Sequence, residues 1–419
     1  MSKITKIEAR EILDSRGNPT LEVDTYINGS LAGGMGRFSV PSGASTGKYE
    51  ALEKRDGDPN RFDGKGVKEL AERIEKEIAP ELIGKEFNQR NLDDFLIEKD
   101  GTENKSNLGA NAILGISMSF AKAEAESLGI PFWKHIGDLS GNTSTSLPTP
   151  MVNIINGGVH ADSGLDIQEF MIVPISGKTF TEKIRRCDEV FYSLKEILIK
   201  NNLGTAVGDE GGFAPKLGSH KKALELMAEA VEKSGYKLGE DFGFALDAAS
   251  SEFYKENKYV LKSENKELNR EELLDYYGEL IKDFPIISIE DPFDQDDWEG
   301  SIMFTEKFGD KIMVVGDDLF VTNSKRLEEG INKKAANAIL IKLNQVGTLS
   351  ETLDVIAKAQ KIGWQTIISH RSGETEDTSI SHLAVGTASK YIKAGSVSRD
   401  ERIAKYNELL RIEESLKNS

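Results

Sequence analysis

The chain has 419 residues, a formal net charge of −17 and a pI near 5.0, with the apolar and charged fractions of a globular protein. Such an acidic chain is unsuited to non-specific binding of nucleic acid or an anionic membrane, so an anionic ligand would need a local cationic site. The single cysteine, Cys187, excludes an internal disulfide and suits a reducing cytoplasm. The N-terminal residues show no apolar leader, and no stretch reaches the roughly 20 apolar residues of a membrane span. We therefore expect a cytoplasmic protein with no membrane span.

The first third of the chain is predicted to hold strands followed by helices. Three strand patterns and then three helical patterns cover 3–15, 20–29, 31–40, 66–82, 91–99 and 107–129. This order predicts a small α+β domain over 1–136. The small polar residues of 137–150 are typical of a linker, so a second domain is expected over 151–419.

From residue 240 onward one pattern recurs: a short run rich in Ile, Val and Leu, a charged residue, and then turn residues. The charged residues after the runs are Asp247, Glu290, Asp317, Lys342, His370 with Arg371, and Lys393. Amphipathic helical patterns separate the runs, and this alternation predicts a parallel sheet, because parallel neighbours need a crossover. We expect an α/β fold in which the sheet closes into a β/α barrel and these side chains meet at one mouth.

Three of these residues are candidate metal ligands. Asp247, Glu290 and Asp317 would repel one another at a shared mouth and would have raised pKa values unless a cation joined them. Ligation by oxygen alone suits Mg²⁺. Each acid taken alone is better explained as a solvated loop residue or a helix N-cap. Three acids on successive strands favour the metal site.

Lys342 and Glu210 are candidates for acid–base chemistry. Lys342 ends an apolar run, where burial and nearby cations would lower its pKa from about 10.4 and free the amine for proton abstraction. Glu210 lies in a Gly-rich turn and could be a general acid if its surroundings keep it protonated. Taken alone, each also has a plain explanation: a lysine snorkelling from a strand end, and an ordinary turn acid.

Positive potential for an anionic ligand comes from His370, Arg371 and Lys393. Arginine forks onto phosphate or carboxylate oxygens, and the neighbouring Ser372 adds a hydroxyl. Lys393 taken alone would be interpreted as a solvated surface lysine.

Two loops rich in small residues, 40–50 and 156–170, have the composition of lid hinges. The second loop carries His160, Gln168 and Glu169.

The sequence resembles the enolase family, of the bacterial type, almost end to end. The matching strings are SRGNPT, PSGASTG, GGVHADSGLDIQEFM, GDEGGFAP, SIEDPF, GDDLFVTN, KLNQVGTLSET, SHRSGETED and LLRIEE. The resemblance implies a small α+β domain that caps an eight-stranded barrel with irregular first strands. It also implies a glycolytic lyase, phosphopyruvate hydratase, which reversibly removes water from 2-phosphoglycerate to give phosphoenolpyruvate. Family members are homodimers or octamers.

The resemblance further implies a role for each site residue. Lys342 would be the base that removes the proton α to the carboxylate, and Glu210, assisted by Glu169, the acid that protonates the departing hydroxyl. Two Mg²⁺ ions are implied. The first would be held by Asp247, Glu290 and Asp317, and the second would bridge the substrate phosphate to Ser45.

The remaining implied roles are contacts with the substrate. Arg371 and Ser372 would bind the phosphate and Lys393 the carboxylate. His160 and Gln168 would line the site beneath the closing loops. His370 belongs to a matching string, but no role is assigned to it.

Three other interpretations stay open. Residues 43–47 fit the Gly-x-Ser-x-Gly elbow of a serine hydrolase, with Ser45 as nucleophile and Asp317 and His370 following in order, although Pro41 interrupts the strand before it. A Schiff-base aldolase could use Lys342. The third is a non-enzymatic surface-binding role, alone or additional, with a cell-surface or secreted pool that needs no signal peptide.

Overall fold

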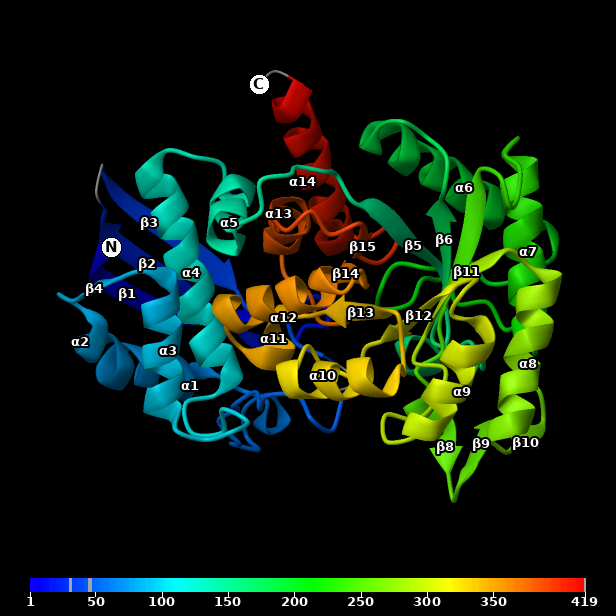
Figure 1. The fold of residues 1–419 in the computed structure, drawn as a ribbon, viewed down its shortest axis with the longest axis horizontal. Helices are drawn as coiled ribbons and strands as arrows, with labels where there is room; N and C mark the ends of the chain where they lie inside the picture. Colours follow the sequence, from blue (N-terminus) through cyan, green and yellow to red (C-terminus); the bar gives the residue numbers. More distant parts are fainter. Residues whose placement is uncertain (30–31, 44–46, 418–419) are drawn as a thin grey trace.

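A computed structural model describes residues 1–29, 32–43 and 47–417 of the chain (Figure 1). The N-terminal part holds a four-stranded antiparallel sheet with strand order β3-β2-β1-β4. Its strands are β1 (Ser2–Leu13), β2 (Pro19–Asn28), β3 (Gly33–Ser39) and β4 (Glu86–Phe87).

Helices follow the first three strands along the chain. They are α1 (Lys68–Arg73), a π-helical turn (Ile74–Ile78), α2 (Ala79–Leu82), α3 (Gln89–Asp100), α4 (Ala110–Leu128) and α5 (Phe132–Ser140). The buried helix α4 lies directly against β2 and β3. Glycine permits this approach, because a Cβ on Gly36 would lie 1.9 Å from Ser119 O.

The rest of the chain forms a closed eight-stranded barrel (Figure 1). In spatial order its strands are β5 (Thr149–Asn156), β6 (Glu169–Pro174), β7 (Phe242–Asp247), β11 (Ile286–Glu290), β12 (Met313–Gly316), β13 (Ala338–Ile341), β14 (Gln365–Ser369) and β15 (Tyr391–Lys393). Neighbouring strands are parallel except around β6, which is antiparallel to both β5 and β7. The expected fold class, an eight-stranded β/α barrel with irregular first strands and an N-terminal α+β domain, is confirmed.

An outer layer of helices covers the barrel (Figure 1). They are α6 (Phe180–Lys200), α7 (His220–Lys233), α8 (Arg270–Asp283), α9 (Trp298–Phe308), α10 (Ser324–Lys333), α12 (Leu349–Lys361), α13 (Ser379–Gly386) and α14 (Asp400–Lys417), with the short α11 (Leu343–Val346). Many begin at a side chain that accepts a backbone N–H of the first turn, as Thr179, Ser219, Asn269 and Thr348 do.

Shorter elements complete the fold. A small sheet of β8 (Tyr254–Lys255), β9 (Lys258–Leu261) and β10 (Lys266–Leu268) follows β7. The segment that joins the N-terminal part to the barrel is shorter than the linker expected over 137–150, because α5 continues to Ser140 and β5 begins at Thr149. Among the helices of the described residues, none is both long and apolar enough to cross a membrane.

Candidate active site

Strand register places charged residues side by side at one mouth of the barrel. Glu290 at the end of β11 is paired with Asp247 at the end of β7, and Lys393 ends β15. Because β6 runs in the opposite direction, its first residue, Glu169, is also paired with Asp247. The first residue of β6 therefore lies at the same mouth as the last residues of the parallel strands.

Lys393 lies among the carboxylates of this mouth. Its Nζ donates to both carboxylate oxygens of Glu290 at 2.9 Å and to Asp247 Oδ2 at 3.0 Å, and it lies 3.3 Å from Glu169 Oε1. Burial alone would lower the pKa of Lys393, but these carboxylates raise it well above its ordinary value. Burial and the Asp247 carboxylate likewise raise the pKa of Glu290 well above its ordinary value. The ammonium group therefore offsets repulsion within a buried acidic cluster.

Lys342, directly after β13, forms an ion pair with Asp317. The other carboxylate oxygen of Asp317 accepts from Gln345 Nε2 at 2.8 Å. Burial alone would lower the pKa of Lys342 and raise that of Asp317, but the ion pair reverses both directions. A general base must be neutral, so Lys342 can act as one only when Asp317 has another cationic partner.

The donor set at the mouth fits a hard divalent cation. Glu290, Asp317 and Asp291 have carboxylate oxygens within 4.8 Å of one another. Asp291 accepts the backbone N–H groups of Asp317 at 3.0 Å and Asp318 at 2.7 Å. Glu290, Asp317 and Asp247 instead accept from the side chains of Lys393 and Lys342, which a bound cation could replace. Oxygen ligands of this kind suit Mg²⁺.

Charge balance supports the same conclusion. Five buried carboxylates belong to Glu169, Glu210, Asp247, Glu290 and Asp317, and Asp291 adds a sixth. The cations are the buried Lys393, Arg371 and Arg402 and the partly buried Lys342. Unbalanced buried charge is costly, and a bound dication would remove the excess.

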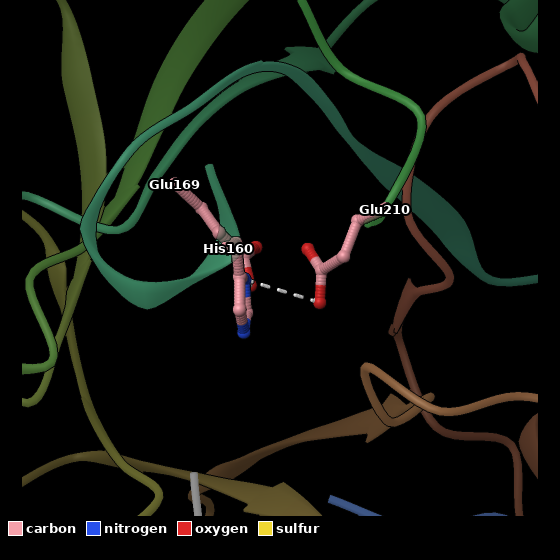
Figure 2. A group of neighbouring side chains, drawn as sticks. All are labelled: His160, Glu169 and Glu210. Carbon is pink, nitrogen blue, oxygen red and sulfur yellow. Dashed lines mark ion pairs between the residues drawn. The ribbon is translucent and has the colours of Figure 1, made fainter. Parts of the chain in front are cut away.

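A second group of acid–base side chains consists of His160, Glu169 and Glu210. Figure 2 shows Glu210 reaching toward the imidazole from its own loop, with Glu169 next to the ring. His160 Nδ1 lies 3.4 Å from Glu210 Oε1 and 3.7 Å from Glu169 Oε1. Burial and the neighbouring Glu210 raise the pKa of Glu169 well above its ordinary value. Burial alone would also raise the pKa of Glu210, but His160 and His370 hold it well below its ordinary value.

The surroundings of Glu210 alone therefore do not keep it protonated. Of the two carboxyl groups, Glu169 is the one whose environment retains a proton.

The tautomer of His370 follows from its partners. Arg402 Nη1, which can only donate, lies 2.7 Å from Nδ1, so the proton of the neutral imidazole sits on Nε2. That Nε2 lies 3.3 Å from Glu210 Oε1. Burial holds the pKa of His370 well below its ordinary value, so the neutral ring points its Nε2–H toward Glu210 without a hydrogen bond to any described residue.

These partners weigh against a serine hydrolase. A catalytic triad needs an Asp–His hydrogen bond, whereas Asp317 is engaged by Lys342 and Gln345, and His370 by Arg402. Ser45 lies outside the described residues.

Arg371 links the mouth to the N-terminal part of the chain. Its two terminal nitrogens lie 3.0 and 3.1 Å from the carboxylate oxygens of Glu50, and Nη1 donates to Asn344 Oδ1 at 2.8 Å. The same forked geometry allows arginine to bind phosphate. Ser372 follows directly and is also buried.

The mouth encloses a small cavity of ≈ 20 Å³, lined by His160, Gln168, Glu169, Glu210, Asp247, Lys342, Ser369, His370, Arg371, Ser372 and Lys393. Ten of these, all except Ser369, are residues that the sequence analysis singled out. Glu290 and Asp317 adjoin the cavity through their ion pairs with Lys393 and Lys342. Glu169 Oε2 and Gln168 Oε1 have no hydrogen-bond partner within the described part of the chain, as expected for groups that contact a ligand or water.

Sequence reasoning missed several residues that position this site. Asn153 Nδ2 donates to Glu210 Oε2 at 3.0 Å, Glu50 pairs with Arg371, and Arg402 holds His370. Only Glu50 had a signal, because it ends the predicted lid over 40–50.

A closed barrel with a buried, charged pocket at this mouth is the arrangement of a β/α-barrel enzyme. Residues 144–419 match the family model described as the enolase C-terminal TIM barrel domain, and residues 4–136 match the enolase N-terminal domain. The chain belongs to the enolase family, whose domains indicate a hydro-lyase.

Proposed function

We propose that the protein catalyses the reversible dehydration of 2-phosphoglycerate to phosphoenolpyruvate, with two Mg²⁺ ions per site. The observation that carries the proposal is the convergence of Lys342 and Lys393 with five buried carboxylates at one mouth. Elimination of water next to a carboxylate needs this combination: a base, an acid and stabilisation of a carboxylate that gains negative charge.

Lys342 is assigned the role of base. It removes the proton from the carbon next to the substrate carboxylate, and the electron pair forms the new C=C bond as the C–O bond to the hydroxyl breaks. Bound at Asp247, Glu290 and Asp317, Mg²⁺ would stabilise the charge that develops on the substrate carboxylate and lower the pKa of Lys342. Lys393 contributes a second positive charge to that carboxylate.

The acid is assigned to the pair of Glu210 and Glu169. The hydroxyl leaves as water once it receives a proton, and the raised pKa of Glu169 means that this pair can store it. His160 and the neutral His370 orient the Glu210 carboxylate toward the pocket. Asn153 fixes its other oxygen.

Arg371 and Ser372 are assigned the role of binding the substrate phosphate. Arg371 would share its fork between the Glu50 carboxylate and the phosphate, which couples ligand binding to the contact with the N-terminal domain. Ser45 is assigned to the second Mg²⁺. Gln168 is assigned to the wall of the pocket.

The test is formation of phosphoenolpyruvate from 2-phosphoglycerate, followed by its ultraviolet absorbance. We expect turnover that EDTA abolishes and added Mg²⁺ restores. Turnover that survives the chelator, or no turnover with Mg²⁺ present, would refute the proposal. Labelling by a serine-directed phosphonate would support the hydrolase, and trapping of substrate by borohydride would support the aldolase.

The sequence resemblance supports three further proposals: a bacterial-type enzyme, a place in cytoplasmic glycolysis, and assembly as a homodimer or octamer of two-domain chains divided at 137–150. Light scattering of the purified chain tests the assembly, because a monomeric mass contradicts it.

A further inference from the structure

We propose that His220 is a positioning residue. Its unprotonated Nε2 accepts the backbone N–H groups of Asp166 and Ile167, near the end of the β5–β6 loop (157–168), and thereby sets the position of Gln168 and Glu169. The inference rests on the proposed function only for its kinetic consequence. Its structural part concerns the loop alone.

The contact is made at the point where the loop enters β6. His220 is the first residue of α7 and is fully buried. Its Nε2 lies 3.1 Å from the backbone nitrogen of Asp166 and 3.3 Å from that of Ile167. Two N–H groups aimed at one ring nitrogen require that nitrogen to be an acceptor.

The other ring nitrogen confirms this tautomer. His220 Nδ1 lies 2.7 Å from the hydroxyl of Tyr276, and that hydroxyl lies 3.2 Å from Glu264 Oε1. Burial and the Glu264 carboxylate raise the pKa of Tyr276, so its phenol stays neutral. Nδ1–H therefore donates to Tyr276, which donates to Glu264, and Nε2 is left free to accept.

The same cluster joins three segments of the chain. Asp166 accepts the backbone N–H groups of Lys262 and Ser263, both at 2.9 Å, and the Ser263 hydroxyl at 2.5 Å. Glu264 accepts the backbone N–H of His220 at 3.0 Å. The β5–β6 loop is thus tied to the start of α7 and to the turn between β9 and β10.

This anchor matters because the outer part of the loop is loosely packed. A cavity of ≈ 400 Å³ lies between the loop and the segment around the β8–β9 hairpin, lined in part by Asp162, Leu165, Phe253 and Val260. The loop carries His160 into the acid–base group, and Gln168 Nε2 lies 3.3 Å from Asp247 Oδ2. A shift at Asp166 and Ile167 would therefore move the side chains of His160, Gln168 and Glu169 in the pocket.

The test compares His220→Leu, which removes the acceptor, with His220→Gln, whose amide oxygen can replace Nε2. Amide hydrogen exchange is measured on the full chain without substrate or metal. We expect exchange in 157–168 to rise about tenfold in H220L, since each buried hydrogen bond contributes roughly a factor of two to ten, and to stay near wild type in H220Q. His135→Leu, which changes another buried histidine on α5, is the matched control and should leave the loop unchanged.

A kinetic readout separates positioning from packing. With 2-phosphoglycerate, kcat should fall about tenfold in H220L and recover in H220Q. Equal loop exchange in wild type and H220L, or equal defects in H220L and H220Q, would overturn the inference.

If H220L does not fold, nitrogen NMR of the wild-type imidazole decides, because a protonated Nε2 near pH 8 contradicts the proposal. If wild type does not turn over 2-phosphoglycerate, the proposed function is refuted. The hydrogen-exchange results would still test the structural role of His220, because they are measured without substrate or metal.

Discussion

Arg402 is a buried cation that holds the loop after β14, and replacing it with methionine tests this role. The side chain is fully buried on α14. Nη1 donates to Arg371 O at 2.5 Å and to His370 Nδ1 at 2.7 Å, while Nη2 donates to Ser372 O at 2.7 Å and Asp209 O at 3.0 Å. Methionine has similar length but no donor, so four buried acceptors lose a partner.

The expected loss can be worked out from these contacts. A buried acceptor left without a partner costs about 1–3 kcal/mol. The low end applies here, because removing a buried charge also relieves its desolvation. Four acceptors then amount to about 4 kcal/mol. For 419 residues, an unfolding entropy of about 2.1 cal/mol/K per residue gives about 0.9 kcal/mol/K, so Tm should fall by about 4–5 °C.

The assay is thermal unfolding followed by circular dichroism. Arg411→Met is the control, because Arg411 lies on the same helix, is exposed and pairs with Glu408 at the surface. It should change Tm by no more than about 1 °C. A Tm for Arg402→Met indistinguishable from that of the control would show that the four contacts do not stabilise the fold, and would refute the reasoning.

Three other changes follow from the site and the surface. Lys342→Ala should lower kcat for 2-phosphoglycerate by about 10²–10⁴-fold with an unchanged circular dichroism spectrum, and near-normal turnover would remove it from the role of base. Asp317→Ala should weaken the Mg²⁺ activation of turnover, so an unchanged Mg²⁺ titration contradicts the metal assignment. Glu408→Gln should destabilise by about 1–2 kcal/mol at neutral pH, after allowance for solvent screening of a partly exposed group, because the hydrogen bond with His382 lowers the pKa of Glu408 to about 2 from 4.5. This stability is complete above pH 4.5 and is lost as pH falls through about 2, so Tm differences from wild type that stay constant between pH 7 and pH 2 would contradict the assignment.

Much of the fold was predictable, because barrel strands are short, apolar and followed by charge. The runs before Asp247, Glu290 and Lys342 became β7, β11 and β13. The direction of β6 was not predictable from its own residues, since a buried strand has the same apolar pattern in either direction. Only the family resemblance implied that the first strands are irregular.

The site was predictable in its members but not in its contacts. A charged residue after an apolar run is visible in the sequence, whereas the partner of each charge depends on segments far apart in the chain. Lys393, interpreted alone as a surface lysine, lies buried among three carboxylates. Likewise, the pKa values of Glu169 and Glu210 shift in opposite directions because of neighbours such as His160, which sequence spacing does not reveal.

The backward course of β6 has an evolutionary consequence. Because β6 runs away from the mouth, α6 must run back toward it and α7 away from it before β7 begins. The segment between these two helices carries Glu210 to the mouth. Under the proposed roles, both members of the acid pair, Glu169 and Glu210, lie in one module that runs from β6 to α7, whereas the proposed metal ligands Asp247, Glu290 and Asp317 end or follow the regular strands. A descendant could acquire a different leaving group by remodelling that module and still inherit its ancestor's way of activating a carboxylate.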